Sequence, residues 1–87
     1  MRDVTIYTTD YCPYCVRAKQ VLKQHDVPFV ELDVTHDPDK RAWLVEQTGQ
    51  RTVPQIFFGD ESIGGCSDLE ALVKRGGLDG KLQRSPP

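Results

Sequence analysis

The chain has 87 residues, of which 38% are hydrophobic and 28% charged, and its formal net charge is −2. A chain of this length has room for one hydrophobic core, and the composition is typical of a globular domain rather than a disordered segment. Both signs of charge are interspersed, which argues against a nucleic-acid binder, and no apolar run is long enough for a signal peptide or a membrane span. We therefore expect a single domain over residues 1–87, located in the cytosol, that binds neither nucleic acid nor membranes.

The first pattern along the chain is an alternation of apolar and polar residues at 3–8, which predicts a strand. A helix is expected directly after it, because Pro13 suits the first position of a helix. Charged residues take one face of this helix. The apolar residues that recur at helical spacing on the other face are Cys15, Ala18 and Leu22.

The middle of the chain predicts a second strand and a second helix. Residues 28–34, PFVELDV, predict a strand that the chain enters through Pro28. The helix is expected at 37–49, because Asp37 can cap its start, Pro38 fits its first position, and Gly49 can end it.

The last part of the chain predicts a hairpin and a third helix. Two strands are expected at 52–58 and 61–65, joined by a Gly-Asp turn. The helix after them should begin at Ser67, which stands in capping-box register with Glu70. Residues 80–87 are expected to be a frayed tail. The order β-α-β-α-β-β-α predicts an α/β fold with a small mixed sheet flanked by helices.

Two cysteines three positions apart, Cys12 and Cys15, lie at the first strand-to-helix turn. Three chemistries use this spacing: a structural disulfide, a metal site and a redox-active dithiol. The cytosol disfavours the first, and an odd number of cysteines disfavours it further. Zinc needs four ligands, and the only other candidates are Cys66, His25 and His36, without a second cysteine pair. The dithiol is therefore the favoured interpretation, with no metal expected.

The position of the dithiol in the helix predicts a different role for each sulfur. Cys12 should lie at the helix start, where the free amides of Tyr14 and Cys15 can stabilise its thiolate, the nucleophilic form. Cys15 lies one turn further in and faces the core, so it should keep its proton. We therefore expect Cys12 to attack and Cys15 to resolve the resulting mixed disulfide.

Three motifs, CPYC, TVPQIFF and IGGCSDL, together resemble a glutaredoxin of the small bacterial dithiol type, over residues 3–79. The resemblance implies a thioredoxin fold, with a four-stranded mixed sheet flanked by three helices. It also implies a glutathione-dependent thiol–disulfide oxidoreductase that uses glutathione as reductant. Such an enzyme reduces glutathione mixed disulfides by a monothiol route and protein disulfides by a dithiol route. The expected partners are glutathione and glutathionylated or disulfide-containing proteins, and we expect a monomer.

The resemblance also assigns the site residues. It makes Cys12 the nucleophile and Cys15 the resolving thiol. It places Tyr14 along the glutathione groove, and it implies that the backbone of Val53, ahead of a cis Pro54, meets the cysteinyl part. The γ-glutamyl end would lie at the start of the last helix, and the two arginines are candidates for the glycine carboxylate. The full glutathione-binding set is Tyr14, Arg41, Arg51, Thr52, Val53, Pro54, Gly65, Cys66, Ser67 and Asp68.

One position departs from the family pattern, and several residues have simpler interpretations. The family usually has lysine three residues before the first cysteine, where this chain has Thr9 followed by Asp10. Pro54 could be an edge-strand proline and Tyr14 a half-exposed aromatic residue. Cys66 could be a small packed hydrophobic residue rather than a redox-active thiol.

Two other functions compete with the glutaredoxin interpretation. A redoxin reduced by thioredoxin reductase could carry the same dithiol, but the GGCSDL motif argues against it. A dimer could bridge an iron–sulfur cluster through Cys12 and glutathione. Pro13 argues against this alternative, because related cluster binders have a smaller residue there.

Overall fold

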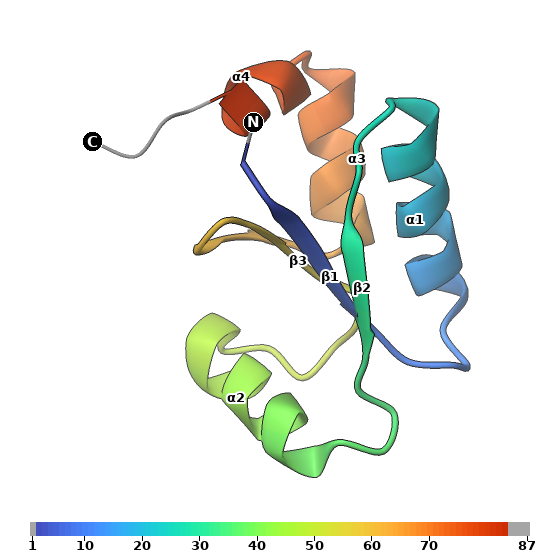
Figure 1. The fold of residues 1–87 in the computed structure, drawn as a ribbon, viewed down its shortest axis with the longest axis vertical. Coiled ribbons are helices and arrows are strands. Elements are labelled where there is room, and N and C mark those ends of the chain that lie inside the picture. Colours follow the sequence, from blue (N-terminus) through green and yellow to red (C-terminus); the bar gives the residue numbers. More distant parts are fainter. Residues whose placement is uncertain (1, 84–87) are drawn as a thin grey trace.

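The computed structural model describes residues 2–83 and contains a four-stranded mixed sheet with helices on both faces (Figure 1). The strand order is β2-β1-β3-β4; β1 and β2 run parallel, and the other two pairs are antiparallel. The predicted sheet and its flanking helices are confirmed, and a fourth helix is added. In chain order the elements are β1 (Val4–Thr8), α1 (Pro13–Gln24), β2 (Val30–Asp33), α2 (Pro38–Thr48), β3 (Gln55–Phe58), β4 (Glu61–Gly64), α3 (Cys66–Lys74) and α4 (Leu78–Gln83).

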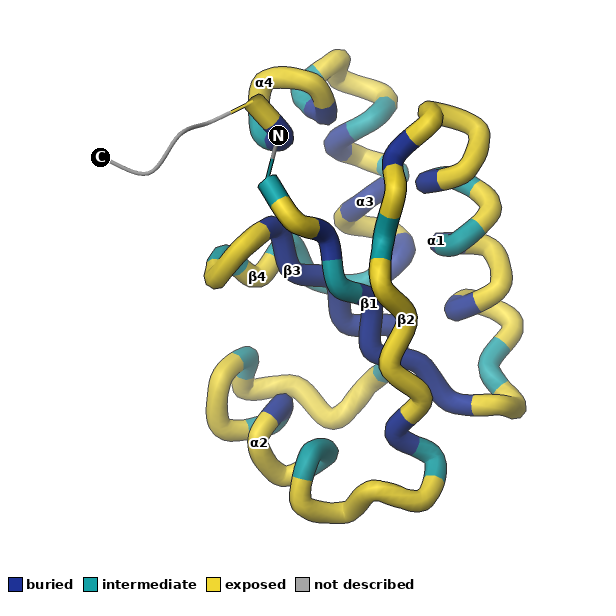
Figure 2. The backbone as a smooth tube through the Cα atoms, viewed as in Figure 1, coloured by how far each residue is buried: buried dark blue, intermediate teal, exposed yellow. Residues whose placement is uncertain are grey.

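Two apolar clusters lie on opposite faces of the sheet. The larger lies on the side of α1 and α3 and includes Ile56 and Phe58 of β3, both fully buried. The smaller lies on the side of α2, where the rings of Tyr7, Trp43 and Phe57 have centroids 5.6 to 5.9 Å apart. Figure 2 shows the resulting gradient, with β1 and β3 buried at the centre and β2 exposed at the edge. Successive side chains of β1 and β3 point to opposite faces of the sheet, so each of these strands contributes residues to both clusters.

The second helix begins and ends where the sequence predicts. Asp37 caps α2, because its Oδ1 accepts a hydrogen bond from the amide of Lys40 at 3.0 Å. Pro38 occupies the first helical position, and Gly49 ends the helix with a left-handed φ of 71°. This ending turns the chain back toward the sheet and starts the loop that leads to β3.

The start predicted for the third helix is wrong. The helix begins at Cys66, one residue before Ser67, and Gly65 occupies the capping position. The amide of Gly65 donates to the Asp68 carboxylate at 2.9 Å. Asp68, at the third helical position, therefore provides the hydrogen-bond acceptor for the capping residue. Glu70 lies two residues too late for this role, and its carboxylate pairs with Arg17 of α1 instead.

The frayed tail predicted at 80–87 is also wrong for residues 80–83, which belong to α4. Leu78 and Leu82 are buried in the larger cluster, and this apolar contact holds the short helix against the sheet and α3. Residues 84–87 lie outside the described part of the chain. None of the helices within residues 2–83 has the length and apolar character needed to cross a membrane.

Polar contacts also fix α4. Glu61 of β4 accepts from Arg2 through one carboxylate oxygen at 2.9 Å and from Lys81 of α4 through the other. The amide of Arg2 donates to the carbonyl of Leu82 at 2.9 Å. The beginning of the chain, β4 and α4 are therefore joined at one end of the sheet (Figure 1).

Candidate active site at the start of helix α1

The reactive sulfur is at the N-terminus of α1. Cys12 is the capping residue, with extended backbone angles, and Pro13 follows at the first helical position. The Cys12 Sγ accepts a hydrogen bond from the amide of Cys15 at 3.2 Å, one of the two predicted contacts. The Cys12 thiol also donates to the carbonyl of Val53 at 3.5 Å, so the sulfur faces the loop before β3. A partly exposed sulfur that receives an amide hydrogen bond can attack a disulfide that approaches from solvent.

The second sulfur is in a different environment. Cys15 is 1% exposed, and burial, together with a hydrogen bond to Cys12, raises its pKa from 9.0 to about 12. The backbone of Thr9 works in the opposite direction. Cys15 therefore carries a proton at neutral pH while Cys12 is reduced, as the sequence predicts. The Thr9 side chain is itself 5% exposed, and its hydroxyl has no hydrogen-bond partner within residues 2–83.

A groove of about 470 Å³ runs along this site. It brings together the loop before β3, the start of α3 and one aromatic residue of α1. All of the predicted glutathione residues except the two arginines line it. Gln50 and Glu70, which were not predicted from the sequence, line it as well. The full lining is Tyr14, Gln50, Thr52, Val53, Pro54, Gly65, Cys66, Ser67, Asp68 and Glu70. The Val53–Pro54 peptide bond is cis, as the resemblance implies.

The two missed residues had weak signals in the sequence. Gln50 lies in the loop between the end of α2 and the Thr-Val-Pro segment, and polar loop residues beside a rigid site often bind ligands. Glu70 lies four residues after Cys66 on α3 and therefore shares its face. From the sequence alone, neither residue can be distinguished from the other polar residues expected on the protein surface.

Two glycines shape the far wall of the groove. Gly64 has a left-handed φ of 105°, and a Cβ atom there would clash with the Asp68 carboxylate. A side chain at Gly65 would approach the carbonyl of Pro54 at 3.3 Å. The glycine pair thus lets β4 turn sharply into α3, so that the free amides at the start of α3 face the groove.

The third cysteine is packed rather than presented to solvent. Cys66 is 5% exposed, belongs to the larger apolar cluster, and has its Sγ 3.6 Å from the Glu70 carboxylate. Burial, followed by the charge of Glu70, raises the pKa of the Cys66 thiol. Arg17 of α1 binds the other oxygen of Glu70 at 2.8 Å. These contacts favour a protonated thiol in the wall of the groove.

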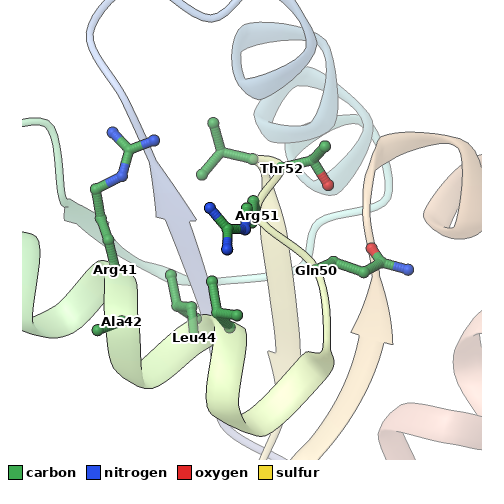
Figure 3. Close-up of a pocket in the computed structure, with 8 residues that line it drawn as sticks. Arg41, Ala42, Leu44, Gln50, Arg51 and Thr52 are labelled. Carbon is green, nitrogen blue, oxygen red and sulfur yellow. The ribbon is translucent and has the colours of Figure 1, made fainter.

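The two predicted arginines line a second cavity of about 400 Å³ between α2 and residues 50–53 (Figure 3). Its floor is apolar and includes Leu44, whereas Arg41 and Arg51 stand over it. Gln50, Thr52 and Val53 line both cavities, so the second cavity adjoins the groove. The arginines are therefore beside the predicted site rather than inside it. Within residues 2–83, no group of three or more His, Cys, Asp or Glu side chains is arranged to hold a metal ion.

Comparison with known proteins agrees with this site. A family model described as glutaredoxin matches residues 4–63. The chain is 49% identical over 82 residues to a glutaredoxin of Pseudomonas aeruginosa, which covers 94% of this chain and 98% of the relative. It is 48% identical over 83 residues to glutaredoxin 3 of Escherichia coli K12, covering 95% and 100% of the two chains.

Solved structures extend the likeness to three dimensions. The crystal structure of a buckwheat glutaredoxin–glutathione complex superposes with a TM-score of 0.85 and 31% identity, covering 93% of this chain and 76% of the other. The fold is therefore the thioredoxin fold that the sequence predicts. With a matching family model and curated relatives of nearly full length, this chain belongs to the glutaredoxin family, whose members are glutathione-dependent thiol oxidoreductases.

Proposed function

We propose that the protein reduces glutathione mixed disulfides through Cys12 alone, and protein disulfides through Cys12 and Cys15 together. The observation that carries this proposal is the position of the Cys12 sulfur. It accepts a hydrogen bond from the amide of Cys15 at 3.2 Å and faces the carbonyl of Val53, which lines a groove of about 470 Å³. A similar structure is described as a glutaredoxin–glutathione complex, which supports glutathione as the occupant of this groove.

The monothiol route has two exchange steps. The Cys12 thiolate attacks the glutathionyl sulfur of a mixed disulfide, forms Cys12–S–SG, and releases the protein thiolate. A second glutathione thiolate then attacks the Cys12-bound glutathionyl sulfur. This step releases glutathione disulfide and regenerates the Cys12 thiolate, so each turnover consumes one free glutathione thiol, and the other half of the glutathione disulfide comes from the substrate.

The dithiol route uses Cys15 after the first attack. Cys12 forms a mixed disulfide with the protein substrate, and Cys15 then loses its proton, attacks the Cys12 sulfur and displaces the substrate thiolate, which takes up a proton. The pKa of Cys15 is raised partly by its hydrogen bond to Cys12 and by the Cys12 charge. Both contributions end once Cys12 is in a disulfide, so Cys15 becomes easier to deprotonate when it is needed. Two glutathione molecules later reduce the Cys12–Cys15 disulfide.

Glutathione would lie with its γ-glutamyl end against the start of α3. The first-turn amides of α3 that follow Gly65 suit its carboxylate, and Asp68 can pair with its ammonium group. The cysteinyl part would meet the backbone of Val53, within reach of Cys12. Arg41 and Arg51 are suitably placed for the glycine carboxylate, since their cavity adjoins the groove.

The test compares two electron sources. The protein is assayed with a glutathionylated peptide, and NADPH is supplied either through glutathione and glutathione reductase or through thioredoxin reductase. We expect rapid turnover only with glutathione, and none in the Cys12→Ser control. Turnover with thioredoxin reductase alone would contradict the proposal. The cytosolic location, the monomeric state and the protein substrates stay predictions.

A further inference from the structure

Gln55, the first residue of β3, is a polar side chain at a fully buried position. Its Nε2 donates to the carbonyl of Thr52 at 2.8 Å and approaches the Oε1 of Gln50 at 3.4 Å. Its Oε1 is buried and has no hydrogen-bond partner in the described part of the chain. All of the polar contacts of this side chain therefore go to the loop that lines the groove.

The chemistry of these contacts fixes the orientation of the amide. The Thr52 carbonyl can only accept a hydrogen bond, so the Nε2 of Gln55 must face the loop and its Oε1 must face the interior. A buried acceptor without a partner is unfavourable, and an apolar side chain of the same shape would avoid that cost. Stability of the fold thus gives no reason for glutamine here, whereas the loop does.

The loop is the part of the groove nearest the reactive sulfur. Gln50 and Thr52 line both cavities, and the Val53 carbonyl beside them accepts from Cys12. Because Gln55 occupies the Oε1 of Gln50, the Nε2 of Gln50 is left as a donor. Figure 3 shows the Gln50 side chain extended away from Arg41 and Leu44, which line the second cavity. This amide therefore lies at the groove, and within residues 2–83 its Nε2 has no hydrogen-bond partner.

We propose that Gln55 is a positioning residue that holds Gln50 and Thr52 in place, and that the Nε2 of Gln50 donates to an oxygen of glutathione in the groove. The inference rests on the proposed function, since it names a further contact for the same substrate. It gives a role to two residues outside the predicted site.

The experiment measures an equilibrium that does not depend on turnover. In a Cys15→Ser background, Cys12–S⁻ reacts with glutathione disulfide to give Cys12–S–SG and free glutathione thiolate. The fraction of Cys12–S–SG is read by mass spectrometry over a series of glutathione redox ratios. We expect Gln50→Ala to lower the equilibrium constant about 3- to 10-fold, as for the loss of one hydrogen bond.

Gln55→Met should give a similar loss while the protein keeps its thermal stability. Methionine has nearly the same shape, and it removes the unpaired acceptor. Thr52 and Gln50 are exposed, so water can replace their lost donor. The double variant should lose no more than the larger single loss, because both residues act through one contact. In the Cys15-containing protein, KM for glutathione should rise while kcat stays unchanged.

The matched control is Gln47→Ala, an exposed glutamine of α2 that lines neither cavity, and it should change nothing. If Gln55→Met lowers the melting temperature but leaves the equilibrium constant unchanged, Gln55 has only a structural role and the inference is overturned. If Gln55→Met fails to fold, Gln50→Ala and Gln50→Glu decide, since they alter only an exposed side chain. An unchanged constant in both would overturn the inference. Normal formation of Cys12–S–SG without glutathione-driven turnover would instead contradict the proposed function.

Discussion

Two sulfurs within one helical turn differ in burial, and this difference determines which chemistry each can perform. Cys12 caps the helix and is partly exposed, whereas Cys15 is 1% exposed and has a pKa of about 12. The peptide unit of Cys15 nevertheless donates its amide to the Cys12 sulfur. We therefore propose two roles for Cys15: its backbone stabilises the nucleophile, and its side chain resolves the intermediate.

Replacing the buried thiol should separate the two routes. Cys15→Ser keeps the backbone amide that reaches Cys12, so deglutathionylation of a small mixed disulfide should persist. Reduction of a protein disulfide such as insulin should be lost or fall strongly, because no thiol within the protein remains to displace the substrate from Cys12, and only free glutathione can do so. Both assays are run with glutathione and glutathione reductase. Loss of the first activity would show that the assignment of roles is wrong.

Alkylation should distinguish the same two thiols by pH. At pH 7, limiting iodoacetamide should label Cys12, while Cys15 and Cys66 are protected by burial and raised pKa values. For Cys15 the folded pKa is about 12 against 9.0 ordinarily, so its stabilising contribution is full below pH 9 and is lost as the pH rises toward 12. Peptide mapping at pH 7 and pH 10, with a urea-unfolded control, checks the order of labelling. Labelling of native Cys15 as fast as Cys12 at pH 7 would contradict it.

Asp68 combines a structural bond with a proposed ligand contact, and one substitution can separate them. Asp68→Asn keeps an oxygen for the Gly65 amide, which Asp68 now binds at 2.9 Å, but removes the charge. We expect little change in melting temperature and a several-fold rise in KM for glutathione that shrinks at high salt. Asp68→Ala should lose both, with about 0.5–2 kcal/mol of stability, the usual cost of a lost helix cap. Equal kinetics for Asp68→Asn and the unmodified protein would show that the carboxylate does not bind the substrate.

At the scale of elements, the site forms because the starts of two helices face one loop. Helices α1 and α3 lie side by side on one face of the sheet (Figure 1), and each begins at its end nearest the groove. One helix start stabilises the sulfur and the other can hold an anion. The loop before β3 closes the space between them, which is why its buried anchor, Gln55, matters.

The start of α2 could be predicted from sequence, but the start of α3 could not, and the reason is physical. Asp37, Pro38 and Gly49 act through their own local backbone preferences, which the sequence states directly. For α3 the sequence pattern of Ser67 and Glu70 was misleading, because the helix start is set by the sharp turn at Gly64, where only glycine avoids the Asp68 carboxylate. The two cysteines proposed as catalytic and most of the groove residues were predicted from motifs.

Contacts between residues far apart in the sequence could not be predicted, because they depend on how the rest of the chain folds. Gln55 could be read only as an ordinary strand residue, because its partners lie in a folded loop. Leu78 and Leu82 make α4 a helix only when α3 and the sheet are present to bury them. Thr9, the departure from the family pattern, is 5% exposed, and this burial could not be predicted from its place in the sequence.

The contacts that fix α4 should respond to acid. Lys81 and then Arg2 lower the pKa of Glu61 to about 2, so the stabilisation is present above pH 4.5, its ordinary value, and is lost as the pH falls through 2. Glu61→Gln should therefore cost about 0.2–1 kcal/mol at pH 7, since the side chains are partly exposed. At about pH 1, below both pKa values, the two proteins should have equal stability. Urea unfolding at both pH values tests this, and an equal difference at each would contradict it.

Taken as a whole, the molecule places the proposed active site and its shortest helix, α4, at opposite ends. Helix α4 lies beside Arg2, far from the start of α1 (Figure 1). Its attachment depends on two buried leucines and one ionic network. Changes there should reach the active site only through the stability of the entire fold.

Leu82→Ala tests this separation. Leu82 is 2% exposed in the larger cluster, so truncation should cost about 2–4 kcal/mol of unfolding free energy. Below the new melting temperature, kcat and KM for glutathione should be unchanged. The exposed Gln83→Ala serves as the control. A raised KM at low temperature would show that α4 influences the groove.

The exposed edge strand β2 also affects how the protein behaves at high concentration. One side of β2 has no neighbour in the sheet, and Val30 and Leu32 are 59% and 40% exposed. Such an edge can recruit a strand from another molecule and start aggregation. Glu31 and Asp33 alternate with the apolar residues, so pairing between copies would bring carboxylates together.

Both carboxylates are kept charged by their neighbours. Burial works to raise the pKa of Glu31, but hydrogen bonds from Lys19 and Thr8 outweigh it and lower the pKa. Hydrogen bonds from Thr35 lower the pKa of Asp33. The repulsion between copies therefore persists into mildly acidic solution, and the contacts that order β2 within the fold also help to keep the protein dispersed.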